Sequence, residues 1–269
     1  MQGTAEVALI AETLNAAAAR LAEARERERR MDRERRDLIA WASHDLRTPL
    51  ASLRALAEAL ADDLAPDEAT RRRYLAGLTA NVERLSGLVD DLFELSAIQA
   101  GAVSLQLEPT SLPDLATEVL DRFEPEAAAA GVRLECQLDG GRPVLAGRDQ
   151  LGRVLANLVA NGIRHTPRGG RVRVAVADGD GTAVLRVTDS CGGIPEADLS
   201  RVFDQLWRGD PARSTKGAGL GLAIARGLVD AHGGSIGVAN VAGGCEFTVR
   251  LPSATSAPTA NGQRRLSGR

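Results

Sequence analysis

The chain has 269 residues, which is enough for about two domains, and 44% of them are hydrophobic, so buried cores can form. Its 33 basic and 36 acidic residues give a net charge of -3, which argues against a general nucleic-acid binder, because such proteins usually carry a strongly basic surface. No run of 18 apolar residues and no secretory signal pattern occurs, so the chain itself is not expected to span a membrane.

The first 60 residues are predicted to be helical. Residues 5–22 are amphipathic, and residues 25–37 are almost wholly charged, which is typical of a solvated helix. We expect a stiff connector that continues into a second pattern without a break. Apolar or small residues then recur at spacings of four and three, which predicts a packed helical seam. These residues are Ile39, Ser43, Leu46, Leu50, Leu53, Ala57 and Leu60.

A second helix is predicted after turn-forming residues at 61–67, with apolar residues from Leu75 to Leu92 at spacings of three and four. Two helices joined by a short turn form an antiparallel hairpin. A single hairpin buries too little surface to be stable alone, so two copies are expected to pair as a four-helix bundle. The sequence therefore predicts a homodimer.

His44 lies one residue away from the predicted seam, so its ring is expected at the edge of the bundle, where a partner can reach it. Asp45 is its neighbour, and Thr48 stands over the same helical face one turn later. Pro49 removes a backbone donor inside the helix and costs about 3 kcal/mol. An energetically unfavourable residue of this kind beside a reactive side chain suggests a functional site.

From Gly101 onwards, alternating strands and helices predict an α/β sandwich, so that the whole chain belongs to the α+β class. Strands are predicted at 103–107, 133–137, 171–177, 183–189, 235–239 and 246–251. Helices are predicted at 111–130, 147–163, 196–203 and 221–231. Residues 254–269 show no periodicity and are predicted to form a disordered tail.

One predicted helix carries Asn157, Asn161 and Arg164 on a single face. Amide oxygens can ligate Mg²⁺, and a guanidinium can bind phosphate. An asparagine that merely caps a neighbouring loop is the alternative for either amide. His165 follows on the same helix and is either part of this face or an exposed ring at the helix end.

Two glycine-rich segments complete the candidate chemistry. Asp189 ends a predicted strand and precedes Gly192 and Gly193, so its carboxylate can accept from an exocyclic amine while a flat ring approaches the bare backbone. Residues 216–222 open a helix, whose N–H groups can bind an anion together with Lys216. This segment matches neither a G-x-x-x-x-G-K-[ST] phosphate loop nor a Rossmann turn.

The remaining candidate residues receive plainer interpretations. His232 is interpreted as a favourable charge near a helix C-terminus. Cys136, Cys191 and Cys245 are widely spaced without a CxxC pair, which indicates neither a disulfide framework nor a zinc site. We expect three small buried apolar residues in a reducing cytoplasm.

Taken together, these segments resemble the sensor histidine kinases of two-component systems, which join a HisKA dimerisation domain to a GHKL/HATPase domain. Residues 43–50 are similar to the H box of that family. Four further boxes follow in the family's order: the N box at 157–167, the G1 box at 189–195, the F box at 201–204 and the G2 box at 217–222. Residues 6–21 are similar to the last helix of a HAMP linker, which in the family follows a transmembrane segment.

The resemblance implies a role for each residue of the H box. His44 would be the phosphoacceptor, and Asp45 would be the base that raises the nucleophilicity of its ring. Thr48 would help to position water when the kinase dephosphorylates its partner. Asp45 stands where glutamate is commoner in the family, which shortens the reach but keeps the same chemistry.

The resemblance also implies a Bergerat ATP-binding sandwich that holds Mg-ATP. Asn161 would ligate Mg²⁺, Asp189 would accept from the adenine amine, and residues 204–216 would form the lid. The remaining predicted nucleotide-binding residues are Asn157, Arg164, His165, Gly193, Ile194, Lys216, Gly217, Gly219, Leu220 and Gly221. Cys191 replaces the usual glycine of the G1 box, and Gly162 replaces the usual alanine of the N box.

The implied domain organisation is a HAMP-like linker at 1–30, a dimerisation and phosphotransfer domain at 31–100, an ATP-binding domain at 101–253 and a tail at 254–269. The implied activity is autophosphorylation by ATP and transfer to an aspartate of a response-regulator receiver domain. An ATP-binding scaffold without transfer is the alternative, motivated by Cys191. An ATP-driven clamp is disfavoured, since it has no use for His44. We expect a cytoplasmic location, with membrane attachment only through a preceding segment.

Overall fold

The computed structural model describes residues 2–62, 64–207 and 219–253. It divides into two compact units, Met1–Leu88 and Val89–Arg269. The predicted tail at 254–269 and most of the predicted lid, residues 208–216, lie outside the described residues. None of the helices in the described parts is long and apolar enough to cross a membrane.

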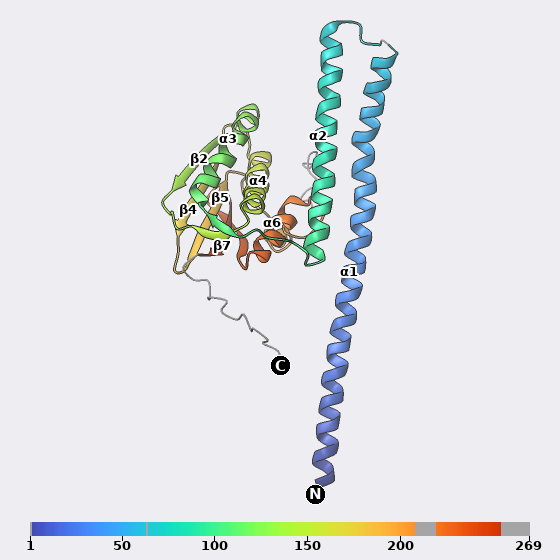
Figure 1. Cartoon of the computed structure of the whole chain (residues 1–269), viewed down its shortest axis with the longest axis vertical. Helices are drawn as coiled ribbons and strands as arrows, with labels where there is room; N and C mark the ends of the chain where they lie inside the picture. Colours follow the sequence, from blue (N-terminus) through green and yellow to red (C-terminus); the bar gives the residue numbers. More distant parts are fainter. Residues whose placement is uncertain (1, 63, 208–218, 254–269) are drawn as a thin grey trace, which may run out of the picture. The chain divides into compact units, whose positions relative to one another are not determined.

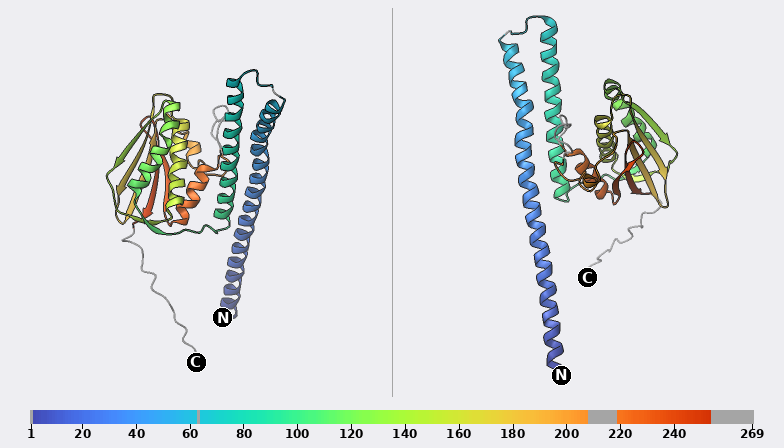
Figure 2. Two further views of the ribbon diagram at one scale, coloured as in Figure 1. Left: turned by 45° about the horizontal axis from the view of Figure 1, so that its top comes forward. Right: turned by 180° about the vertical axis from the view of Figure 1, so that it is seen from behind.

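The first unit is a helical hairpin built from α1 (Gln2–Ala61) and the first part of α2 (Glu68–Gln99). The prediction of an unbroken helix through the charged stretch and His44 is confirmed, because α1 continues past Pro49. Asp67 begins the second helix by accepting from the Thr70 backbone N–H at 2.6 Å. The two helices run antiparallel and side by side (Figures 1 and 2), and Asn81 Nδ2 donates to Ser52 Oγ at 3.3 Å.

The predicted seam on α1 is only partly correct. Among the α1 residues whose burial is described, Leu38, Ala42 and Pro49 are buried, whereas Ile39 and Leu50 are 58% and 60% exposed. Ser43 and Ala57 are also exposed. Within one chain α2 covers a single face of α1. Part of the predicted seam therefore lies on that covered face, and the rest lies on an uncovered face beside it.

The second unit contains a five-stranded sheet in the order β2-β4-β5-β7-β6. The strands are β2 (Arg133–Leu138), β4 (Arg171–Asp178), β5 (Thr182–Asp189), β6 (Ser235–Val241) and β7 (Gly244–Pro252). The predicted hairpin is confirmed as the antiparallel pair β4 and β5, with Val172 opposite Asp189. Strand β2 lies parallel to β4, and all other neighbours are antiparallel.

Three helices, α3 (Leu112–Ala130), α4 (Arg148–His165) and α6 (Gly221–Ala231), cover one face of this sheet (Figures 1 and 2). Alternation along β4, where every second residue is buried, directs its valines toward the helices. The core between the layers is aliphatic, as the composition predicts. Its fully buried members include Leu155, Leu158, Val159, Ile224 and Leu228.

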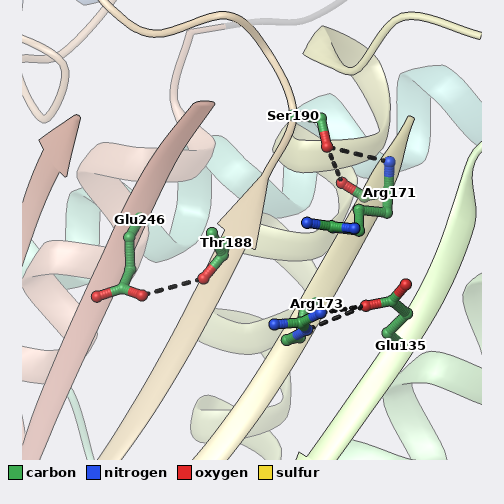
Figure 3. A network of polar contacts seen from close by, with 6 residues as sticks. All are labelled: Glu135, Arg171, Arg173, Thr188, Ser190 and Glu246. Carbon is green, nitrogen blue, oxygen red and sulfur yellow. Dashed lines mark hydrogen bonds and ion pairs between the residues drawn. The ribbon is translucent and has the colours of Figure 1, made fainter. Parts of the chain in front are cut away.

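The opposite face of the sheet is polar (Figure 3). Arg173 donates to Glu135 Oε2 through two nitrogens, at 3.0 and 2.8 Å. Thr188 Oγ1 donates to Glu246 Oε2 at 3.1 Å on the neighbouring strands. Cross-strand polar pairs of this kind suit a solvated face, so the domain is a two-layer sandwich, as predicted.

Two of the predicted elements are wrong. No strand forms at 103–107, because the pairing partner, β3 (Val144–Ala146), is only three residues long and pairs with β1 (Glu108–Thr110) instead. The helix predicted at 196–203 is reduced to α5 (Glu196–Leu199). After it, Arg201 and Asp204 donate backbone bonds three residues back, to Asp198 and Arg201, which makes successive turns.

His232 connects the end of α6 to the start of α4. Its Nδ1 lies 2.7 Å from the Leu228 carbonyl oxygen, and its Nε2 accepts from the Gly147 backbone N–H at 3.0 Å. A ring that accepts through one nitrogen and donates through the other is neutral. The interpretation of His232 as a helix-end charge is therefore wrong, and the ring acts as a neutral bridge.

Replacing His232 with alanine should lower the free energy of unfolding by about 1–2 kcal/mol, because it removes both bonds and leaves the Gly147 N–H without its acceptor. Urea denaturation of the full chain measures this change. Asp230→Ala, at an exposed position of the same helix end, is the control and should change stability by less than about 0.5 kcal/mol. Equal effects of the two substitutions would contradict the bridging role.

Candidate functional site

His44 is held at the surface of α1, as the sequence predicts. Its side chain is 81% exposed, and its Nδ1 lies 2.9 Å from Asp45 Oδ1. The Asp45 side chain is only 15% exposed. With the proton on Nδ1 shared with this carboxylate, Nε2 is the unprotonated ring nitrogen. The pair therefore presents a nucleophilic nitrogen whose partner nitrogen is fixed by an anion.

Thr48 and Pro49 lie one turn further along α1, and the structure places them differently. Thr48 is exposed like His44, whereas Pro49 is buried. Because proline has no N–H, the Asp45 carbonyl lacks its usual helical donor at this point. The helix nevertheless continues without interruption to Ala61, so the irregularity is confined to one missing bond.

The second candidate site begins on α4, where Asn157 faces the start of α6. A Cβ placed on Gly221 would lie 3.2 Å from Asn157 Oδ1, so the two helices approach as closely as a glycine permits. Asn157 Nδ2 is buried and has no hydrogen-bond partner. A buried amide donor without a partner is rare in proteins and indicates a position that a ligand or water satisfies. Asn161, one turn later on the same face, is half-buried.

The glycines before α6 are required by their surroundings. Gly219 has a φ of 71°, and a Cβ there would lie 3.0 Å from the Trp207 carbonyl oxygen. Leu206 donates its backbone N–H to the Gly219 carbonyl at 3.1 Å. Leu220 is completely buried, so its side chain is not available to a ligand. Lys216 and Gly217 lie outside the described residues.

Asp189 ends β5 in a nearly closed environment. The residue is 4% exposed, and its Oδ1 accepts from the Cys191 backbone N–H at 2.9 Å. Its Oδ2 accepts from the Cys245 thiol at 3.2 Å. A Cβ on Gly162 would lie 3.6 Å from the Asp189 Cβ, so this glycine lets α4 pack closely against the carboxylate. Each carboxylate oxygen keeps a second lone pair for a ligand amine.

The loop that follows Asp189 has ordinary backbone at Cys191. Positive φ values occur at Gly192 and Gly193, which are 86° and 98°. The cysteine therefore causes no backbone strain, although it replaces the family's usual glycine. Burial, followed by the hydrogen bond to Asp189, raises the pKa of the Cys191 thiol, and burial, followed by the charge of Asp189, raises the pKa of Cys245.

Asn240 fixes the same loop and was missed by the sequence analysis. Its Oδ1 accepts from the Ile194 N–H at 2.8 Å, and its Nδ2 donates to the Ile194 carbonyl at 2.7 Å. A Cβ on Gly193 would lie 3.3 Å from Asn240 Oδ1. A single asparagine on a strand, 46 residues from its partner, gives no local signal in the sequence.

Arg164 and His165 lie at the exposed end of α4. Partial desolvation, with the neighbouring Arg164 charge, lowers the pKa of His165, while Asp189 opposes this shift. The structure thus sets Gly221 of α6 beside Asn157, and Asp189 of β5 beside Gly162, on the same helix α4.

Two family profiles match the chain. Residues 34–101 match the His Kinase A (phospho-acceptor) domain, which includes His44. Residues 146–255 match the histidine kinase-, DNA gyrase B-, and HSP90-like ATPase domain, which includes Asn157, Asp189 and Gly221. The phospho-acceptor match thus contains the His44 site, and the ATPase match that follows it contains the second candidate site.

The curated relatives are named as sensors and histidine kinases. The chain is 36% identical over 225 residues to the signal transduction histidine-protein kinase BaeS of Escherichia coli, covering 81% of this chain and 47% of the relative. It is 38% identical over 236 residues to the sensor protein SphS of Synechococcus elongatus, covering 83% of this chain and 56% of the relative. The chain thus spans about half the length of these relatives.

Solved structures agree with the fold. The histidine kinase AdeS of Acinetobacter baumannii is 28% identical with a TM-score of 0.62, over 78% of this chain and 98% of that one. Full-length ShkA in complex with AMPPNP is 27% identical with a TM-score of 0.62, over 82% of this chain and 46% of that one. Both similarities extend over most of the chain described above.

Substituting Gly221 with alanine should weaken binding of an ATP analogue by about tenfold, because the new Cβ displaces the Asn157 amide and costs about one hydrogen bond to a charged ligand. Isothermal titration calorimetry measures the affinity. Gly237→Ala is the matched control, since no atom lies within 4 Å of a Cβ built there. Unchanged affinity in the Gly221 variant would contradict the contact between α6 and Asn157 as part of the site.

Proposed function

Because this chain belongs to the family of two-component sensor histidine kinases, we propose that it phosphorylates its own His44 with ATP and passes the phosphoryl group to an aspartate of a response-regulator receiver domain. One observation carries the proposal. An exposed histidine fixed by a carboxylate occurs in the same chain as a site with a buried, unpartnered amide beside a glycine-lined helix start.

The nucleotide site fits the adenine and phosphate ends of ATP through different residues. The second lone pairs of Asp189 would accept from the adenine amine, while Gly193 and Ile194 line the loop that Asn240 holds in place. Asn157 Nδ2 would donate to a phosphate oxygen or to a water that bridges to it. The backbone of Gly219, Leu220 and Gly221 opens α6 toward the phosphates.

Further groups are proposed for the phosphate end. Asn161 would offer its amide oxygen to Mg²⁺, which neutralises charge on the phosphate oxygens when it is bound. Arg164 would bind phosphate oxygens with its guanidinium, and His165 would lie close to the nucleotide. Lys216 is proposed as a phosphate contact because its charge precedes the start of α6, and Gly217 because it belongs to the family's G2 box.

In the proposed transfer, Nε2 of His44 attacks the γ-phosphorus, and the bond from that phosphorus to the bridging oxygen breaks as ADP leaves. Asp45 keeps the proton on Nδ1 and stabilises the positive charge that develops on the ring. The phosphoryl group then passes from Nε2 to a receiver carboxylate. Thr48, exposed on the same face, would position water when the phosphorylated receiver is hydrolysed.

The alternative of a scaffold that binds ATP without transferring phosphate was motivated by Cys191. Its backbone is unstrained, since the positive φ values fall on the two glycines that follow it. The loop therefore keeps the conformational freedom that the family's motif supplies. This geometry favours the kinase over the scaffold.

Incubation with Mg²⁺ and γ-labelled ATP tests the kinase proposal. The wild-type chain should acquire label that is labile in acid and stable in base, as a phosphohistidine is, and His44→Gln should acquire none. Arg84→Gln, at an exposed position of α2 outside both sites, is the control and should retain the label. ATP binding without any label in the wild type would support the scaffold instead.

We also propose that two copies of the chain pair through the hairpin. Six large apolar residues among the described residues of the first unit are at least half exposed: Leu21, Ile39, Leu50, Leu64, Leu75 and Val82. Leu75 and Val82 lie seven residues apart on α2, the repeat of a helical seam. An apolar row of this kind rarely remains in contact with water, and the HisKA match supplies the same expectation of a dimer.

Val82→Glu should shift the protein from dimer to monomer, because each copy would bury a charge in the paired face. Light scattering coupled to size-exclusion chromatography measures the mass. Arg84→Glu introduces the same side chain at an exposed position of the same helix and should remain dimeric. A monomeric wild type would contradict the proposed pairing.

The cellular setting is proposed on the family resemblance. A cytoplasmic location suits the supply of ATP and of receiver domains, and any membrane attachment would come through sequence before residue 1. No nucleic-acid partner is proposed, since the net charge is -3. The limits at residues 30, 100 and 253 remain predictions, and the break between the compact units falls inside α2.

A further inference from the structure

The fold brings two cysteines together that are 54 residues apart in the sequence. Pairing of β5 with β7 sets Cys245 opposite Asp189, and Cys191 follows Asp189 by two residues. The two sulfur atoms are 3.5 Å apart, and the Cys245 sulfur lies 3.2 Å from Asp189 Oδ2. The three donor atoms all lie within 4.8 Å of one another, and among the described residues no other such group of three occurs.

We propose that Cys191, Cys245 and Asp189 form a binding site for a thiophilic divalent cation of the Zn²⁺ and Cd²⁺ class. In a tetrahedral zinc site with Zn–S bonds of about 2.3 Å, two sulfurs lie about 3.8 Å apart, and a sulfur and a carboxylate oxygen about 3.6 Å apart. The distances in the structure are 3.5 and 3.2 Å. Shifts of a few tenths of an ångström would therefore complete the geometry.

The site is closed on one side and open on the other. Cys245 and Asp189 are 2% and 4% exposed, whereas Cys191 is half-buried and leaves a path by which the ion and a fourth ligand can enter. Each thiol releases its proton to the buffer as its sulfur binds the metal. Sulfur donors select soft cations, so this site is chemically distinct from the amide oxygen proposed to bind Mg²⁺.

A disulfide between the two cysteines is a different outcome of the same proximity. The third donor, the Asp189 carboxylate, has no part in a disulfide but completes a metal site. The two thiols also belong to a chain of hydrogen bonds. The Gly193 N–H donates to Cys191 Sγ, and the Cys191 thiol donates to Cys245 Sγ. Thiols that are protonated and partly buried react slowly with oxidants, so the observations favour the metal.

Occupation of this site would compete with the nucleotide. A cation on Oδ2 would neutralise the charge of the Asp189 carboxylate and draw it toward the two sulfurs, which weakens its hydrogen bond to an adenine amine. The cation should therefore lower the affinity for adenine nucleotides, and this consequence rests on the proposed function of Asp189. The metal site itself does not depend on that function, because binding can be measured without any nucleotide.

Titration of the reduced, metal-free full chain with Cd²⁺ tests the site, since cadmium thiolates absorb in the ultraviolet. The wild type should bind one equivalent with the absorption of two thiolates. Cys191→Ala and Cys245→Ala should each lower the affinity at least tenfold. The matched control is Cys136→Ala, which removes an exposed thiol and should bind like the wild type.

Two results would overturn the proposal. One is the absence of thiolate absorption in the reduced wild type, and the other is absorption that is lost in Cys136→Ala but kept in Cys191→Ala. If both thiols are lost on exposure to air, and the chain binds no Cd²⁺ once it is reduced again, the two cysteines form a disulfide pair instead. Should Cys245→Ala fail to fold, Cys191→Gly carries the test, because that position has ordinary backbone and is half-buried.

The competition is measured separately, with a fluorescent ATP analogue in excess Mg²⁺. One equivalent of Cd²⁺ should weaken analogue binding at least tenfold in the wild type and leave it unchanged in Cys191→Ala. Cadmium binding without any effect on the analogue would overturn the competition. Cadmium binding in a chain that binds no analogue would count against the proposed nucleotide site and leave the metal site standing.

Discussion

The close packing of α4 against the end of β5 is the constraint on which the nucleotide-binding domain depends. Gly162 makes it possible, because a Cβ there would press on the Val172 methyl groups at 3.1 Å and approach Asp189. With the helix this close, the Asp189 carboxylate is buried, and the polar face of α4 lies beside it. Chemistry that belongs to three separate elements is thereby concentrated at one end of the sandwich.

The same two helices are tied together at both ends. Asn157 contacts the start of α6 at Gly221, and Gly147 bonds to His232 at the end of α6. Ten residues separate the two contacts on α4 and eleven on α6, so the helices pack antiparallel over that whole length. The bridge at His232 thus holds α6 in the position where its first residues face the buried Asn157 amide.

The sequence predicted local features well and distant contacts poorly. The α6 limits, the β4–β5 hairpin and the exposure of His44 follow from periodicity and turn residues, which are local. The strand at 103–107 was wrong because a strand needs a partner, and β3 is only three residues long. Asn240 and the Cys191–Cys245 pair could not be predicted, since each depends on strand pairing between residues far apart in the chain.

A crystal structure of the full chain with Mg²⁺ and a non-hydrolysable ATP analogue tests most directly whether Asp189 and Asn157 belong to one nucleotide site. The adenine amine is expected within hydrogen-bond distance of Asp189. Asn157 Nδ2, which is buried and has no partner in the structure, is expected to donate to the nucleotide or to a bridging water. An analogue bound elsewhere, with the Asn157 amide still lacking a partner, would contradict this expectation.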